Sequence, residues 1–155
     1  MEFSFILNGK RVVCDISDNQ TLLDLLRDSL GVTSVKKGCE QGECGACTVL
    51  LDGEPVTSCL VLARRIEGRE VTTVEGLVDD PKMKSLREAF LEEGAVQCGY
   101  CTPGMLLSAY SLIRSNLDPT EAQVKKAIEG NLCRCTGYVK IIEAIIHAAK
   151  KLKSE

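Results

Sequence analysis

The first part of the chain alternates apolar and polar positions with the period of a β-strand. Apolar residues recur at every second position over 3–7 and again over 12–16. Between the two runs stand Asn8 and Gly9, a pair typical of a tight hairpin turn with positive φ. We therefore predict an N-terminal β-hairpin.

The next segment changes to helical spacing. Thr21 and Asp24 form the pattern of a capping box, and Gly31 ends the segment. The expected buried face of this helix consists of Leu22, Leu25, Leu26 and Leu30. Farther on, residues 47–51 and 55–59 flank a second hairpin turn at 52–54, and residues 70–76 have the composition of a last strand. Two hairpins and one helix predict a small sheet that grips the helix.

The second half of the chain carries helical periodicity throughout. Four segments have apolar residues at helical spacing, and they are residues 81–94, 103–116, 119–130 and 138–151. Three of them start with a capping residue and then a proline at the first helical position, at Asp80-Pro81, Thr102-Pro103 and Asp118-Pro119. Four short helices predict a compact bundle. The strand pattern stops near residues 75–80, so we expect two domains, residues 1–77 and residues 78–155.

Composition and charge exclude several classes of function. The chain has 155 residues, 45% of them hydrophobic, with 19 Lys and Arg against 22 Asp and Glu, for a net charge of -3. No basic run is present that would bind a nucleic acid backbone. The first residues alternate in polarity, unlike a secretion signal, and no apolar run is long enough for a membrane span. We expect a cytoplasmic protein.

The number of cysteines indicates that the chain binds metal. The chain has nine cysteines, and in a reducing compartment they favour metal binding over disulfides. Cys14 shares a strand face with Val12 and Ile16 and is expected to be a buried core thiol. The other eight form two groups of four, one in each half of the chain, which predicts one metal site in each domain.

The first group has the spacing of a plant-type [2Fe-2S] ferredoxin loop. Cys39, Cys44 and Cys47 give C-x4-C-x2-C, and Cys59 follows on the next hairpin. Glycines 38, 42 and 45 let the loop turn sharply and direct backbone N–H groups at the sulfurs. A zinc site is the alternative, although zinc ligands usually come in shorter paired motifs. A Rieske centre needs two histidines, and the chain has one.

The second group reads C-x2-C, then 31 residues, then C-x-C. Its members are Cys98, Cys101, Cys133 and Cys135. Each pair is followed by Thr and an expected helix start, so we predict that the four thiols meet at two helix N-termini. The positive end of a helix dipole would stabilise a negatively charged thiolate cluster there.

Together these motifs resemble the small iron–sulfur subunit of the molybdenum hydroxylases, the xanthine dehydrogenase, aldehyde oxidoreductase and carbon monoxide dehydrogenase group. The resemblance rests on "GCEQGECGAC" at 38–47 with the later Cys59, on "QCGYCTPGM" at 97–105 and on "GNLCRCTGY" at 130–138. It covers nearly the whole chain. It implies an α+β protein, with an N-terminal β-grasp plant-type ferredoxin domain followed by an all-α four-helix bundle that binds a second [2Fe-2S] cluster.

The resemblance also implies partners and a function. In the family, the helical-domain cluster lies next to molybdopterin in a large catalytic subunit, and the other cluster passes electrons to FAD in a medium subunit. By this likeness Gln97 and Cys135 would hydrogen-bond the pterin, although Gln97 could instead cap its loop. The expected assembly is a heterotrimer or a dimer of heterotrimers. Its substrate would be a purine, nicotinate, an aldehyde, carbon monoxide or hydroxybenzoyl-CoA.

No catalytic residue is predicted on this chain. It has no G-x-G-x-x-G motif, no P-loop and no nucleophile with a plausible base. The expectation is therefore an electron-transfer subunit of an oxidoreductase whose catalytic site lies on another chain. Two alternatives remain open, namely a free-standing two-cluster ferredoxin and a zinc-binding scaffold.

Five further side chains have modest expected roles. Lys36 and Lys37 are expected to be solvated charges, with an acidic partner as the alternative. Tyr100 and Tyr138 are expected either to shield the second cluster from water or to pack in the core. His147 is expected to lie on the surface or in an interface and not to bind metal.

Overall fold

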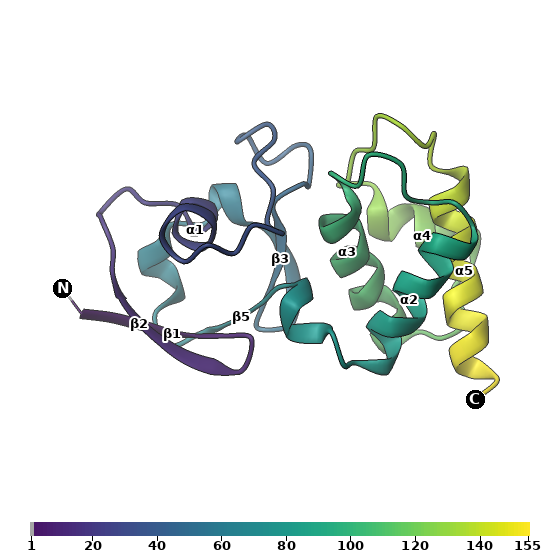
Figure 1. The fold of residues 1–155 in the computed structure, drawn as a ribbon, viewed down its shortest axis with the longest axis horizontal. Helices are drawn as coiled ribbons and strands as arrows, with labels where there is room; N and C mark the ends of the chain where they lie inside the picture. The colour runs from purple at the N-terminus through teal and green to yellow at the C-terminus, as the bar shows by residue number, and fades with distance from the viewer. Residues whose placement is uncertain (1) are drawn as a thin grey trace.

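The computed structural model describes residues 2–155 and consists of two domains side by side (Figure 1). The N-terminal domain is built on a five-stranded sheet of strand order β2-β1-β5-β3-β4. The strands are β1 (Glu2–Leu7), β2 (Lys10–Asp15), β3 (Thr48–Leu51), β4 (Glu54–Thr57) and β5 (Glu70–Thr72). β1 and β5 are parallel, and the other neighbours are antiparallel. This confirms the predicted small sheet of two hairpins and a last strand, and the parallel pairing of β1 with β5 is an addition to it.

Both predicted hairpin turns form because their residues tolerate positive φ. Asn8 and Gly9 have φ of 51° and 79°, and Asp52 and Gly53 have φ of 49° and 86°. The strands that they connect pair in register from Glu2 with Asp15 and from Thr48 with Thr57. In the first hairpin this register places Phe3 and Phe5 on the face that packs in the core.

The helix that packs against the sheet begins as predicted and then changes from α-helical to π-helical geometry. Thr21 caps α1 (Leu22–Asp24) by accepting a hydrogen bond from the Asp24 backbone N–H at 3.0 Å. The chain continues as a π-helical segment, η1 (Leu25–Ser29), and Gly31 follows with φ of 70°. Leu23 is buried as well as the predicted Leu22, Leu25 and Leu26, whereas Leu30 is only half-buried. The apolar stripe is therefore wider than the predicted face.

Short 3-10 segments complete the first domain and lead into the second. They are η2 (Ser58–Leu60), η3 (Ala63–Ile66) and η4 (Val74–Leu77). The core of the first domain contains Phe5, Leu25, Val49 and Ile66, each 1% exposed or less. Cys14 is half-buried at the edge of that core, so its predicted burial is only partial.

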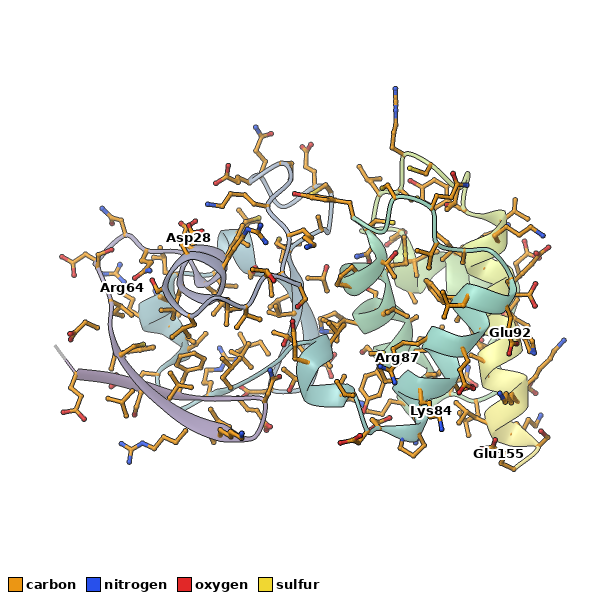
Figure 2. All side chains as sticks on the ribbon, in the orientation of Figure 1. Asp28, Arg64, Lys84, Arg87, Glu92 and Glu155 are labelled. Atoms are coloured by element: carbon orange, nitrogen blue, oxygen red, sulfur yellow. The ribbon has the colours of Figure 1, made fainter. Side chains whose placement is uncertain are left out.

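The second domain is a bundle of four helices, as predicted. They are α2 (Pro81–Glu92), α3 (Thr102–Ser115), α4 (Glu121–Ile128) and α5 (Val139–Lys153). Their facing apolar residues, such as Phe90, Met105, Ile113 and Ile145, form a second core. Charged side chains such as Lys84, Arg87 and Glu92 lie on the outer surface (Figure 2).

One of the three predicted proline caps is correct. Asp80 accepts hydrogen bonds from the backbone N–H groups of Lys82 and Met83. At α3 the cap is Cys101, and Thr102 is already helical. At α4 the cap is Thr120, because its hydroxyl and the Gln123 side chain form a reciprocal capping box.

Strand β3 belongs to both domains. All four of its residues are buried, and successive side chains of a strand point to opposite faces. Val49 and Leu51 pack in the first core, whereas Leu50 packs in the core of the helical bundle. Because β3 starts directly after Cys47, this shared strand fixes the first cysteine loop against the second domain.

Candidate metal centres

The first candidate centre is the loop that precedes β3. This loop holds Cys39, Cys44 and Cys47, and Cys59 approaches it from η2. Three backbone N–H groups, those of Gln41, Glu43 and Cys44, each point at Cys39 Sγ from 3.3 Å. Two more, from Cys39 and Ala46, point at Cys44 Sγ from 3.4 and 3.5 Å. The loop therefore surrounds these two sulfurs with donors, as the sequence predicted.

These donors favour negative charge on sulfur. The pKa of Cys39 is lowered to about 7, first by the Gln41 N–H and then by those of Cys44 and Glu43. By contrast, burial raises the pKa of Cys59 to about 11, and the neighbouring Cys47 thiol adds to the effect. One side of the site is thus half-exposed and rich in donors, and the other side is buried against the sheet.

The second candidate centre joins two loops of the helical domain. Cys98 and Cys101 lie between α2 and α3, and Cys133 and Cys135 lie between α4 and α5. The neighbouring Cys98 side chain is the first cause that raises the pKa of Cys135, and the Cys133 side chain adds to the effect of burial on the pKa of Cys101, so each of these pairs lies close together. The structure thus brings together all four cysteines of the predicted second set.

Only one of the two pairs lies at a helix N-terminus. Cys101 directly precedes the first turn of α3, so this pair lies at a helix N-terminus as predicted. Helix α5, however, begins at Val139, so Cys133 and Cys135 lie on the preceding loop and not at its first turn. The left-handed Tyr138, with φ of 74°, separates that loop from the helix. The predicted meeting of two helix dipoles is wrong for this half of the site.

Side chains next to the second centre hold its loop. The Thr136 hydroxyl donates to Cys133 Sγ at 3.1 Å, and Tyr138 Oη accepts from the Cys133 N–H at 2.9 Å. Burial alone would raise the pKa of Cys133, but the hydrogen bonds from Thr136 and Cys135 outweigh it and lower that pKa. Burial raises the pKa of Cys101 to about 12, with Cys133 as the next cause.

The eight cysteines come together in pairs, and this tests which metal group they fit. The pairs are Cys39 with Cys44, Cys47 with Cys59, Cys98 with Cys135, and Cys101 with Cys133. Zinc takes its four ligands around one ion, whereas a [2Fe-2S] cluster shares four thiolates between two irons. Each group offers four thiolates, and the backbone N–H donors aimed at the sulfurs of the first group suit the negative charge of a [2Fe-2S] cluster.

The remaining predicted site residue lies on the exposed side of the second centre. Gln97 is exposed, as are Cys98 and Cys135, whereas Cys101 and Cys133 are half-buried. Gln97 and Cys135 are therefore both accessible to another molecule at this face.

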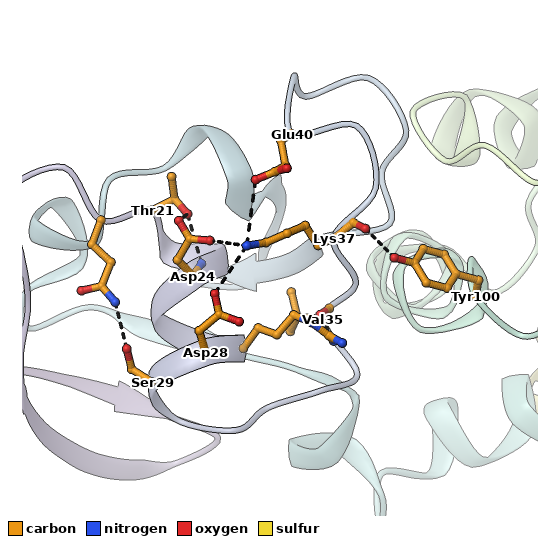
Figure 3. A network of polar contacts seen from close by, with 10 residues as sticks. Thr21, Asp24, Asp28, Ser29, Val35, Lys37, Glu40 and Tyr100 are labelled. Carbon is orange, nitrogen blue, oxygen red and sulfur yellow. Dashed lines mark hydrogen bonds and ion pairs between the residues drawn. The ribbon is translucent and has the colours of Figure 1, made fainter.

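Lys37 departs from its expected role as a solvated charge. Its Nζ lies 2.7 Å from Asp24 Oδ1, 3.4 Å from Asp28 Oδ2 and 4.0 Å from Glu40 Oε1 (Figure 3). The Tyr100 hydroxyl donates to the Lys37 carbonyl, so Tyr100 reaches from the second cysteine loop to the first. Tyr100 is 48% exposed and is not a core residue.

His147 lies on the helical surface, as expected, where its ring nitrogen Nδ1 is 2.8 Å from Glu93 Oε1.

The cysteine loops of the two domains also touch directly. The Leu132 N–H donates to the Cys44 carbonyl at 2.8 Å, and the Asn131 side chain donates to the Gly45 carbonyl at 3.2 Å. In Figure 1 these loops emerge on the same side of the molecule. Asn131 had no place in the sequence interpretation, although its position two residues before Cys133 is the signal that marks it.

Comparisons with known proteins agree with this arrangement. The family model for the 2Fe-2S iron-sulfur cluster binding domain matches residues 5–77, and that for the [2Fe-2S] binding domain matches residues 73–146. The chain is 51% identical over 145 residues to the nicotinate dehydrogenase small FeS subunit of Eubacterium barkeri, covering 94% of this chain and 92% of that protein. It is 47% identical over 148 residues to the nicotine 6-hydroxylase small subunit of Paenarthrobacter nicotinovorans, covering 96% and 89%.

Solved structures share the fold over almost the whole chain. Quinoline 2-oxidoreductase from Pseudomonas putida 86 has a TM-score of 0.92 at 44% identity, covering 99% of this chain and 96% of that one. Aldehyde oxidoreductase from Desulfovibrio desulfuricans has a TM-score of 0.92 at 40% identity, covering 99% of this chain and 17% of that one. In residues 2–155 there is also no helix with the length and apolar character that crossing a membrane requires.

Proposed function

Because the chain belongs to the small iron–sulfur subunits of the molybdenum hydroxylase family, we propose that it relays electrons between a molybdopterin centre and FAD. The molybdopterin would lie on a large partner subunit and the FAD on a medium partner subunit. The chain is an iron–sulfur subunit of an oxidoreductase, and the substrate site lies on another chain. The cytoplasmic location remains a prediction.

The proposal rests on one observation, the direct contact between the two cysteine sites where the two domains meet. Cys44 of the first site accepts a hydrogen bond from Leu132, which directly precedes Cys133 of the second site. When bound, each [2Fe-2S] cluster accepts and releases a single electron. A lone ferredoxin would need one such site, whereas a relay between two partners needs two sites close together.

The chain's own residues give the two sites different surroundings. At the first site, backbone N–H groups stabilise charge on Cys39 and Cys44, while Cys47 and Cys59 are buried. At the second site, Cys98 and Cys135 are exposed beside Gln97. We propose that this exposed face meets the molybdopterin subunit, with Gln97 and Cys135 hydrogen-bonding the pterin.

The relatives support a substrate class for the complex. The two relatives described above are named for nicotinate and nicotine, and another, at 43% identity over 145 residues, is named for caffeine. All three names refer to nitrogen heterocycles. We therefore favour a nitrogen-heterocyclic substrate, with an aldehyde as the second candidate because aldehyde oxidoreductases also match.

Gentle purification of the native complex tests the proposal. We expect a large and a medium subunit, molybdenum and flavin to accompany the chain, as a heterotrimer or its dimer. Adding nicotinate or a purine should bleach the visible iron–sulfur absorbance, and an aldehyde is the comparison substrate. Recovery of the chain alone, with both clusters intact and no molybdenum or flavin, would favour a free-standing ferredoxin instead. A colourless protein that contains zinc would contradict the whole proposal.

Cysteine variants test the ligand set and the order of the relay. Cys47→Ala and Cys133→Ala should each lose one of the two clusters, while Cys14→Ser should keep the full iron and sulfide content. In the assembled complex of Cys47→Ala, substrate should still reduce the helical-domain site, and flavin reduction should slow severely. In Cys133→Ala the first-domain site should stay oxidised. The opposite pattern would show that the proposed order is wrong.

A further inference from the structure

A buried asparagine closes the seam between the two domains. Asn131 is 5% exposed. Its amide oxygen accepts from Ser108 Oγ at 2.7 Å, a bond within the helical domain. Its amide nitrogen donates to the Gly45 carbonyl at 3.2 Å and to Thr48 Oγ1 at 3.3 Å, both in the first domain. One side chain therefore holds both domains through opposite ends of its amide.

Glycines let the backbones approach closely enough for these bonds. A Cβ on Gly45 would lie 2.2 Å from the Gly130 carbonyl oxygen and 2.9 Å from Asn131 Cα. A Cβ on Gly104 would lie 2.4 Å from the Gly45 carbonyl oxygen. Three chain segments thus meet with no room for a side chain between them, and the short Asn131 amide spans the remaining gap.

The same seam lies between two cysteine sites. Gly45 follows Cys44 directly, and Asn131 lies two residues before Cys133. The Leu132 N–H adds a hydrogen bond to the Cys44 carbonyl at 2.8 Å. Any movement of Asn131 away from Gly45 would therefore move a cysteine-bearing loop of one domain relative to that of the other.

We propose that Asn131 is a positioning residue that holds the two cysteine loops at a fixed separation, so that the first loop depends on a side chain of the other domain. The inference goes beyond the proposed relay and rests on it only for the identity of the ligands. If Asn131 served only its own domain, as a partner for Ser108, its removal would leave the first loop unchanged.

Amide hydrogen exchange distinguishes these two roles. The complex with both clusters is compared with three variants, Asn131→Ala, Asn131→Asp and Ser108→Ala, after iron has been counted in each. Asn131→Asp keeps the oxygen that accepts from Ser108 but replaces the donor that faces the Gly45 carbonyl, so it removes the bonds that Asn131 itself makes to the first domain. Asn116→Ala is the control, because Asn116 bonds to Gln123 and Asp118 at the other end of α3.

We expect exchange to speed up in the peptide that covers residues 38–50, in the domain that carries no substitution. Loss of the two donor bonds should accelerate it roughly 10-fold or more in Asn131→Ala and Asn131→Asp. Ser108→Ala should accelerate it less, because Ser108 supports Asn131 only indirectly. Asn116→Ala should match the wild type.

Unchanged exchange over 38–50 in an Asn131 variant that retains all its iron would overturn the inference. If both Asn131 variants fail to fold, Ser108→Ala decides: faster exchange over 38–50 supports the inference and unchanged exchange overturns it. Failure of the proposed function is a separate result. It would appear as missing iron or missing partners in the wild-type protein itself.

Discussion

Lys37 anchors the start of the first cysteine loop to the helix beneath it. The Asp24 carboxylate at 2.7 Å is its nearest partner, and Asp28 and Glu40 stand farther away. The hydrogen bond from Lys37 is the largest cause that lowers the pKa of Asp24, and the bond to Asp24 likewise raises the pKa of Lys37. Residue 37 precedes the cysteine loop, so this pair restrains the loop at its entry.

We predict that Lys37→Met lowers the thermal stability of the first site by less than a core substitution would, since the pair is partly exposed. The lowered pKa of Asp24 means that its contribution is present above the ordinary value of 3.8 and is lost as the pH falls through the folded value. The raised pKa of Lys37 keeps its charge present up to 10.5 and beyond. The temperature at which the visible cluster absorbance is lost should therefore be lower in Lys37→Met than in the wild type, by the same amount at about pH 5 and at about pH 9. Lys36→Met is the control, and an equal loss in that variant would contradict the prediction.

At the scale of the element, the cap of α4 shows where local sequence patterns compete. Asp118-Pro119 has the pattern of a cap and first helical residue, yet the helix begins two residues later. Thr120 bonds to the Gln123 N–H at 3.2 Å, and Gln123 Oε1 accepts from the Thr120 N–H at 2.9 Å. These two reciprocal hydrogen bonds give partners to two backbone N–H groups at the start of the helix. Asp118 instead pairs with Lys153, 2.8 Å away on α5.

We predict that Thr120→Ala destabilises the helical domain by about 1 kcal/mol, the usual contribution of a cap. Asp118→Ala should cost less, because it removes only an exposed ion pair. Urea denaturation of the two variants measures the difference. A larger loss for Asp118→Ala would restore Asp118 as the functional cap.

Most elements could be predicted from sequence because their signals are local. The Asn8-Gly9 turn and the four helical stretches each carry their own pattern, and the spacing of cysteines identified both sites. The π-helical turn at Leu25–Ser29 and the start of α5 after Tyr138 could not be predicted in this way. Both depend on tertiary packing, and so does Asn131, whose partners Gly45 and Thr48 are more than 80 residues away in sequence.

A glycine inside α3 provides a further prediction at this scale. An alanine in a helix is ordinarily better than glycine by about 1 kcal/mol. At Gly104, however, the added Cβ would meet the Gly45 carbonyl at 2.4 Å, whereas at Gly130 no atom lies within 4 Å. We therefore predict that Gly104→Ala destabilises the protein and loosens the first site, and that Gly130→Ala does neither. Melting temperature and iron content measure both effects, and a more stable Gly104→Ala would contradict the close contact.

At the scale of the whole molecule, the two domains share one strand. Leu50 of β3 is 2% exposed and lies in the core of the helical bundle, while its neighbours Val49 and Leu51 lie in the first core. Arg114 of α3 adds a bond to the Gly53 carbonyl at 2.8 Å, at the turn that follows β3. A relay whose sites lie on different domains needs such a rigid connection, because the separation of the sites must not fluctuate.

The last prediction tests whether that strand makes the molecule one cooperative unit. Since Leu50 fills a space in the neighbouring domain, Leu50→Ala should cost about 2–5 kcal/mol through lost burial and the cavity that remains. It should also separate the unfolding of the two domains, because the first core keeps Val49 and Leu51 while the helical core loses its contact with β3. Urea denaturation of Leu50→Ala should then show two transitions, whereas the wild type should show one. The visible absorbance reports on the clusters, and circular dichroism reports on the helices of the second domain. Leu60→Ala is the control, because Leu60 is 63% exposed beside Cys59 and should change stability little. A single transition shifted as a whole in Leu50→Ala would mean that the hydrogen bonds of Asn131 and Leu132 are enough to couple the domains without the shared strand.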